Sequence, residues 1–313
     1  MLERNGKVLA TTGPVTPSDS RLRRSQSLAH ETGTALKIAR ELIAQKLHGQ
    51  ELVLKKFFPE NLTSFQVIVD ARRAVARSSS NEEIRRWKEK RALAYWSAMR
   101  ALPVSFNKSD SARIPDHWKI FGSRISPITK SPRLAVNPAN AILNYLYAIL
   151  ESESRLALAT LGLDPGIGVL HNDLRSRDSL ASDLMEPVRP RVDELLLKLL
   201  TSEQLRREWF FEQRDGNCRL MASFAEKLSE TATIWRTAVA SYAEWIAKSF
   251  WGSRLRPIRS ETPATRLTQR ERGEGRVKLS AGIGEAHPEN LSLCRICGQI
   301  RMASDGICRE CKS

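Results

Sequence analysis

A histidine and two carboxylates are the residues of this sequence best suited to chemistry. His171 follows a turn-rich loop at residues 162–168, which reads Gly-Leu-Asp-Pro-Gly-Ile-Gly, and Asp183 and Glu186 follow in a segment predicted to be helical. Residues three apart share one face of a helix, so both carboxylates can point at the same place. A histidine held by a rigid loop beside paired carboxylates suits a hard divalent metal, which indicates a metal-dependent enzyme. The alternative is an ordinary histidine beside a solvated acidic helix face.

A second candidate site lies in the last twenty residues. Two Cys-x-x-Cys pairs stand ten residues apart there, formed by Cys294, Cys297, Cys308 and Cys311. Four thiolates at this spacing predict a tetrahedral structural Zn²⁺, with a redox pair or unliganded thiols as the alternatives. Four sulfurs would close the coordination shell, so the predicted role is structural. The pattern is also typical of a reducing compartment.

The charge of the chain points to a polyanionic partner. Its 313 residues include 50 Lys and Arg against 35 Asp and Glu, a formal net charge of +15. Nucleic acid and an acidic membrane surface both fit that excess. No apolar run approaches the roughly 20 residues that span a bilayer, and the N-terminus lacks a signal-peptide pattern, so we expect a cytoplasmic protein.

The elements that must position these residues are predicted to be helices. Apolar residues recur at helical spacing from residue 36 to 47, a helix is expected over about 82–100, and Asn137-Pro138 is typical of a helix start. That helix should reach about Leu161. Further helices are expected over 179–200, interrupted by Pro187 and Pro190, and over 221–249. Strand signal is nearly absent.

The predicted fold is therefore all-α, a multi-helix catalytic domain with a remnant N-terminal strand segment and a small C-terminal zinc knuckle. The expected domains are residues 1–20, 21–252, 253–290 and 291–313. The third of these is rich in arginine and poor in large apolar residues, which indicates a disordered basic linker.

Three segments together resemble a known family. Residues 137–147, the 162–168 loop with His171, and the run Asp183-Leu184-Met185-Glu186 followed by Arg189-Pro190 closely resemble the CRISPR-associated endonuclease of the Cas-one family, the integrase of spacer acquisition. The order and spacing of the segments match as well. The resemblance runs from about residue 21 to about 251, roughly three quarters of the chain.

The resemblance implies a Mn²⁺ or Mg²⁺ site built from a glutamate, a histidine and a second acid. The histidine falls on His171 and the second acid on Glu186, with Asp183 beside it. The position of the first glutamate falls on Lys88, and the next residue, Glu89, is the candidate for the third metal ligand beside His171 and Glu186. An ammonium has no lone pair and repels a cation, and Glu89 lies about 100° further around a helix.

The resemblance also implies that the chain joins a free 3′-hydroxyl of a short DNA to a phosphodiester, working on double-stranded and branched DNA as a homodimer bridged by a small Cas-two partner. The family carries an N-terminal β domain, and residues 1–12 look like its end, so we expect a truncated gene, one half of a split gene, or a wrongly assigned start codon. A basic run would then hold the DNA backbone, although such runs are often only a solvated face. Its members are Arg85, Arg86, Lys88 and Arg91.

Two alternatives remain open from sequence. Because of Lys88, the chain could be a catalytically silent relative that still binds DNA. It could also be a zinc-organised interaction protein with no role on DNA.

Overall fold

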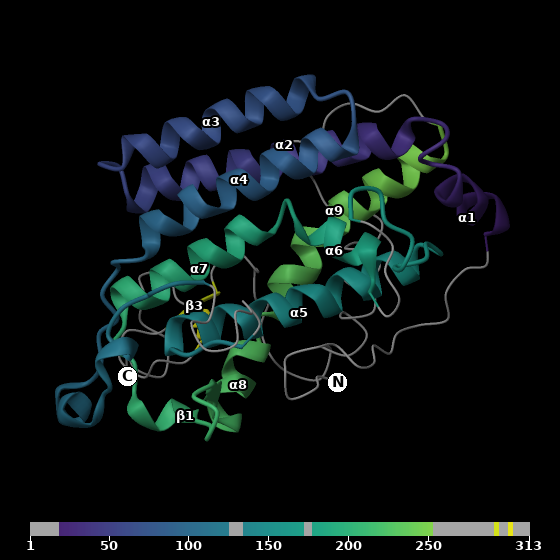
Figure 1. Ribbon diagram of the computed structural model, residues 1–313. Coiled ribbons are helices and arrows are strands. Elements are labelled where there is room, and N and C mark those ends of the chain that lie inside the picture. Colours follow the sequence, from purple (N-terminus) through teal and green to yellow (C-terminus); the bar gives the residue numbers. More distant parts are fainter. Residues whose placement is uncertain (1–18, 125–133, 172–176, 253–290, 294–299, 303–313) are drawn as a thin grey trace, which may run out of the picture.

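The computed structural model describes residues 19–124, 134–171, 177–252, 291–293 and 300–302. Helices dominate these residues, as predicted, and Figure 1 shows their arrangement. In chain order the α-helices are α1 (Ser20–Ser27), α2 (Thr34–Phe57), α3 (Leu62–Arg77), α4 (Asn81–Met99), α5 (Pro138–Thr160), α6 (Ser179–Met185), α7 (Arg189–Ser202), α8 (Ala222–Ser229) and α9 (Ala232–Phe250).

The remaining elements are short. Within the described ranges, the 3₁₀ turns are η1 (Lys108–Arg113), η2 (Asp116–Trp118) and η3 (Arg207–Trp209). The strands are β1 (Phe210–Glu212), β2 (Cys218–Leu220), β3 (Leu291–Leu293) and β4 (Ile300–Met302). Among the described residues, β1 pairs with β2 and β3 with β4, both antiparallel. The β1–β2 hairpin was not predicted and is the main departure of the described body from the all-α expectation.

The helices pack in two groups around a shared core. Figure 1 shows α2, α3 and α4 side by side, with α7 between this group and α5. Helix α5 also packs against α6 and α9. The apolar face predicted for residues 36–47 is buried in α2, where Ile38, Leu42 and Ile43 are inaccessible or nearly so. The site therefore forms where α2, α4 and the α6–α7 junction meet.

Local sequence explains where two of these helices begin. The Asn137 side chain accepts a hydrogen bond from the Asn140 backbone N–H at 2.9 Å, and Pro138 occupies the first helical position. This confirms the predicted start of α5. The predicted interruption near Pro187 and Pro190 is also confirmed, since α6 ends at Met185 and α7 begins at Arg189.

The prediction of one continuous helix over residues 221–249 is wrong. The chain divides it into α8 and α9 at Glu230 and Thr231. Thr231 is buried, and its hydroxyl oxygen accepts a hydrogen bond from Trp235 Nε1 at 2.9 Å. Neither glycine nor proline marks this break, so the helical spacing of apolar residues predicted one continuous helix.

Several predictions fall on residues that the structure does not describe. These are the N-terminal remnant up to residue 18, the 253–290 linker, the zinc ligands Cys294, Cys297, Cys308 and Cys311, and the side chain of Glu89. They stay predictions, as do the domain boundaries.

Candidate active site

The loop that carries His171 is tied to the first helix. Gly162 adopts a positive φ of 80°, which lets the chain turn directly after α5. Gln26 of α1 then clamps the loop: its Nε2 donates to the Asp164 carbonyl at 2.7 Å and to the Ile167 carbonyl at 3.0 Å, and its Oε1 accepts from the Asp164 N–H at 3.0 Å. One buried amide thus satisfies three backbone groups of the loop.

Asp183 of α6 fixes the end of this loop and the histidine ring together. It is fully buried, and its Oδ2 accepts from the backbone N–H groups of Val169 at 2.7 Å and Leu170 at 2.9 Å. Its Oδ1 accepts from the His171 N–H at 3.1 Å and lies 2.5 Å from His171 Nδ1. A carboxylate at Nδ1 favours the tautomer with the proton on that nitrogen, so that Nε2 faces the site as an acceptor.

Gly168 allows the loop to lie against α6. A Cβ at this position would come within 2.6 Å of Ser179 Cβ and 2.8 Å of the His171 carbonyl oxygen. The close approach brings the backbone N–H groups within reach of Asp183. The glycines of the loop therefore serve the placement of His171.

Glu186, directly after α6, is surrounded by cations. It is 1% exposed, with Lys88 Nζ 2.8 Å from Oε1 and Lys46 Nζ 2.7 Å from Oε2. Arg189 Nε lies 3.9 Å from Oε2. Burial alone would raise the pKa of Glu186, but the charges of Lys46, Lys88 and Arg189 outweigh it and hold that pKa well below its usual value. Burial lowers the pKa of Lys46, opposed by its pairing with Glu186.

The side chains of Lys88, His171 and Glu186 converge, with Lys88 in contact with the other two. Its Nζ lies 2.6 Å from His171 Nε2 and 2.8 Å from Glu186 Oε1, while those two atoms are 3.7 Å apart. The predicted convergence of His171 and Glu186 is therefore present. Asp183 stands apart from Glu186 in function, because its oxygens face the loop and the far side of the imidazole.

The described side chains around His171 and Glu186 do not form a donor set that fits a divalent metal. The third side chain at the junction is an ammonium without a lone pair, and Lys46 brings a second cation to the same carboxylate. Among the described residues, no group of three or more His, Cys, Asp or Glu is placed to hold a metal ion. The predicted Mn²⁺ or Mg²⁺ site stays a prediction, and the ammonium groups of Lys46 and Lys88 disfavour it.

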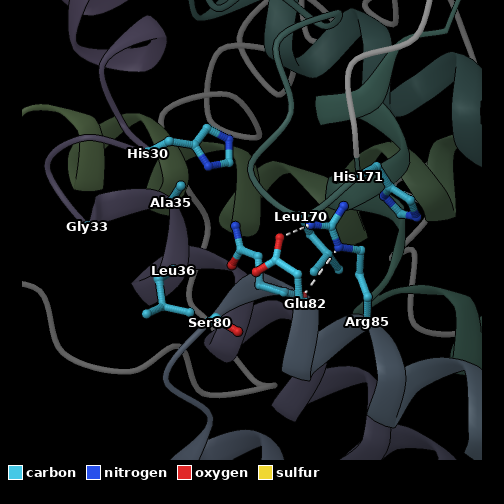
Figure 2. A pocket seen from close by; sticks show the side chains of 10 residues that line it. His30, Gly33, Ala35, Leu36, Ser80, Glu82, Arg85, Leu170 and His171 are labelled. Carbon is cyan, nitrogen blue, oxygen red and sulfur yellow. Dashed lines mark hydrogen bonds and ion pairs between the residues drawn. The ribbon is translucent and has the colours of Figure 1, made fainter.

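A pocket of about 460 Å³ opens beside His171 (Figure 2). His30, Asn81 and Arg85 are among its polar lining residues, and Figure 2 shows Arg85 near His171, paired with Glu82 at 2.7 Å. The pocket is thus wide enough for a small part of a larger ligand and borders the site directly.

The predicted DNA-binding run divides into different environments. Arg86 is exposed, Arg85 lines the pocket, and Arg91 lies over the Trp87 ring with its guanidinium 4.9 Å from the ring centroid. Lys88 turns inward to His171 and Glu186. A role in DNA binding stays a prediction for all four.

Sequence reasoning missed Lys46 and the position of Arg189. Lys46 lies three residues after Ile43 and one before Leu47, on the apolar face of α2. A lysine in that register is a signal that it meets a buried carboxylate, although the pattern does not say which one. Arg189 was quoted only as part of a motif, yet it approaches Glu186 and lies over the Tyr147 ring.

Comparison with known proteins identifies the family. The family model described as "CRISPR associated protein Cas1" matches residues 1–232. The chain belongs to the Cas1 family. This confirms the resemblance recognised from the sequence.

Curated Cas1 proteins align with most of the chain. It is 30% identical to CRISPR-associated endonuclease Cas1 1 of Archaeoglobus fulgidus, over 78% of this chain and 74% of the relative. It is 32% identical to CRISPR-associated endonuclease Cas1 2 of Rhodospirillum rubrum, over 72% of this chain and 65% of the relative. The match thus spans slightly less than two thirds of the second relative.

Solved structures share the Cas1 fold with this chain. A casposase bound to its integration product gives a TM-score of 0.62 at 24% identity, covering 84% of this chain and 78% of the casposase. A Cas1 protein from Thermotoga maritima gives 0.62 at 22% identity, covering 82% and 80%. A partial Cas6-RT-Cas1–Cas2 complex gives 0.61 at 17% identity, covering 84% and 80%. In the described part of our Cas1-family chain, no helix is long and apolar enough to cross a membrane.

Proposed function

We propose that this chain is a DNA endonuclease and integrase of CRISPR spacer acquisition, acting on double-stranded and branched DNA. The observation that carries the proposal is the convergence of His171 and Glu186, 3.7 Å apart, in segments that resemble the family's catalytic site. Curated relatives are named endonucleases, and one structural neighbour is a casposase bound to an integration product. These names support the same class of reaction.

The side chains present can serve a phosphodiester reaction in two ways. Cutting or joining the backbone concentrates negative charge on the phosphoryl oxygens, which positive groups stabilise. Lys46, Lys88 and Arg189 all lie within 4 Å of Glu186, so cations outnumber the carboxylate they surround. His171, oriented by Asp183, offers Nε2 for moving a proton at the attacking or leaving oxygen.

Assembly is part of the proposal. We propose a homodimer that works with a small Cas2 partner, as the resemblance implies. Neighbours of the same fold include chains from Cas6-RT-Cas1–Cas2 complexes, which supports such an assembly. The zinc knuckle remains a separate proposal for the last twenty residues.

The test is a branched-DNA cleavage and joining assay with the full chain. We expect His171→Ala to lower the rate by at least about 100-fold, the contribution typical of a group that transfers a proton. The matched control is His48→Ala, because His48 lies on α2 with its side chain 46% exposed and outside the site. Equal activity of the His171→Ala variant and the natural chain would contradict the proposed site.

The contact of Lys88 with both His171 and Glu186 favours a second candidate, a catalytically silent relative that binds DNA through its positive surface. The Lys88→Glu variant separates the two candidates in the same assay with Mn²⁺ or Mg²⁺ present. Activity in the natural chain supports the enzyme. Activity that appears only after the substitution supports the silent relative.

A further inference from the structure

The space between His171 and Glu186 has the dimensions of a small-cation site. Two ligands of one Mg²⁺ or Mn²⁺ ion, each bound at about 2.1 Å, can be at most about 4.2 Å apart. His171 Nε2 and Glu186 Oε1 are 3.7 Å apart, which falls within that limit. The orientation of His171 by Asp183 is also what a metal-binding histidine needs.

The Lys88 ammonium lies in that space. Its nitrogen is 2.6 Å from one of the two atoms and 2.8 Å from the other, which are hydrogen-bonding distances for a charged donor. The side chain is 20% exposed, so its head group is held largely within the protein. Lys88 therefore donates to His171 Nε2 and to Glu186 Oε1 at the same time.

Among the residues that the structure describes, the carboxylates at this site already have partners. Glu186 Oε2 is paired with Lys46 at 2.7 Å, and the Asp183 oxygens accept from three backbone N–H groups and face Nδ1 of His171. A divalent ion would have to displace Lys88 and remain close to Lys46. Both lysines disfavour that exchange by charge repulsion.

We propose that Lys88 is the resident cation of this site: its ammonium takes the place of the divalent ion and keeps Mn²⁺ and Mg²⁺ out. The site carries its own cations, with Lys46 and Lys88 each paired with one oxygen of the Glu186 carboxylate. One charge reversal, Lys88→Glu, turns the same pocket of donors into a site with two carboxylates and an imidazole. The inference concerns the site of the proposed function but holds for either candidate function, because it is a statement about binding.

The test counts bound Mn²⁺ on the full chain without DNA, by the loss of the free-ion signal in electron paramagnetic resonance. We expect the natural chain and its His171→Ala variant to bind the same number of Mn²⁺ ions. For Lys88→Glu we expect one additional Mn²⁺ site, lost again in the Lys88→Glu/His171→Ala double variant. Lys55→Glu is the matched control, since Lys55 is exposed on α2 and the charge change is identical.

Thermal unfolding gives a second readout that does not depend on activity. Lys88→Glu should melt below the natural chain without metal, because two carboxylates then meet in a buried site. Mn²⁺ at about 100 times its dissociation constant should raise the melting temperature of the variant by on the order of 5 °C. For the natural chain and for Lys55→Glu, the Mn²⁺-induced change in melting temperature should be the same with and without the His171→Ala substitution.

A Mn²⁺ site in the natural chain that His171→Ala abolishes would overturn the proposal. The absence of any gained site in a folded Lys88→Glu variant would overturn it equally. If that variant does not fold, Lys88→Gln replaces it, because the amide removes the charge and offers an oxygen ligand. Lys88→Gln should gain a weaker Mn²⁺ site. If a folded Lys88→Gln variant gains none, the proposal is contradicted. DNA processing is not measured, so failure of the proposed function would leave these outcomes readable.

Discussion

Asp183 and Glu186 are buried carboxylates one helical turn apart with different work to do. The Asp183 carboxylate accepts hydrogen bonds from the backbone of the His171 loop and contacts the imidazole ring itself. Glu186 faces Lys46 and Lys88 instead. The same residue chemistry at i and i+3 thus gives one positioning group and one group that faces the site.

A third buried carboxyl, Asp193, should make stability depend on pH. It accepts hydrogen bonds from the Tyr95 hydroxyl at 2.9 Å and the Tyr147 hydroxyl at 2.5 Å, and burial raises its pKa from 3.8 to about 6. A raised folded-state pKa means that the native chain holds the proton more tightly than the unfolded chain. Its contribution is therefore present below the unfolded pKa of 3.8 and is lost as pH rises to about 6.

The Asp193→Asn variant tests this. Two pKa units correspond to about 3 kcal/mol, so the unfolding free energy of the variant minus that of the natural chain should rise by up to about 3 kcal/mol between pH 4 and pH 7. Urea unfolding across this range measures it. Asp70→Asn is the control, because Asp70 is exposed and its difference should stay flat. A flat difference for Asp193→Asn would contradict the assignment.

At the scale of elements, the site depends on how closely α2 approaches α7. Gly49 of α2 lies against Pro190, and a Cβ at Gly49 would be 2.8 Å from Pro190 Cβ. Lys46 is one turn earlier on the same helix, and Pro190 follows Glu186 by four residues. The absence of a side chain at residue 49 therefore allows Lys46 to reach Glu186.

Gly49→Ala should destabilise the chain although alanine is the better helix former. The propensity gain of about 1 kcal/mol is opposed by an overpacking cost of about 1–3 kcal/mol, and we expect a net loss. Denaturant unfolding measures the change. Lys55→Ala, at an exposed position of α2, should stay within about 0.5 kcal/mol of the natural chain. A more stable Gly49→Ala variant would show that the α2–α7 contact yields easily.

Sequence reasoning reached the elements with strong local signals and missed those set by distant contacts. Asn137-Pro138 carries its own start signal, so α5 was predicted closely. The division of α8 from α9 has no such signal, because it depends on Thr231 and Trp235 packing in the core. The β1–β2 hairpin offered only the Asp215-Gly216 turn, which is weak evidence beside three-residue strands.

The candidate site shows the same limit. His171, Asp183 and Glu186 lie within sixteen positions of one another, and their order carried the family resemblance. Lys46 reaches Glu186 from another helix far away in the sequence, so no local spacing could join them. Lys88 was recognised as a lysine at a ligand position, but only the structure shows that it contacts both His171 and Glu186.

At the scale of the whole molecule, the net charge of +15 should dominate association with nucleic acid. Phosphate contacts release counterions, so the logarithm of the association constant should fall linearly with the logarithm of salt concentration, by about 0.9 per phosphate contacted on duplex DNA. This dependence separates a DNA-binding chain from a zinc-organised interaction protein.

Fluorescence anisotropy on a labelled duplex measures that dependence. Arg86→Glu, in the exposed part of the basic run, should weaken binding and reduce the slope by about 1. Lys55→Glu carries the same charge change on α2 and serves as control. A binding constant independent of salt would rule out the DNA proposal.

The clamp that Gln26 places on the Asp164–Ile167 backbone has a consequence for the order of folding. Partner groups 138 and 141 residues apart must meet before the loop has its bonds, and closing so long a stretch of chain is slow compared with forming a helix. We therefore expect α1 to dock before the imidazole takes its final place. The reactive centre would then be among the last parts of the molecule to mature.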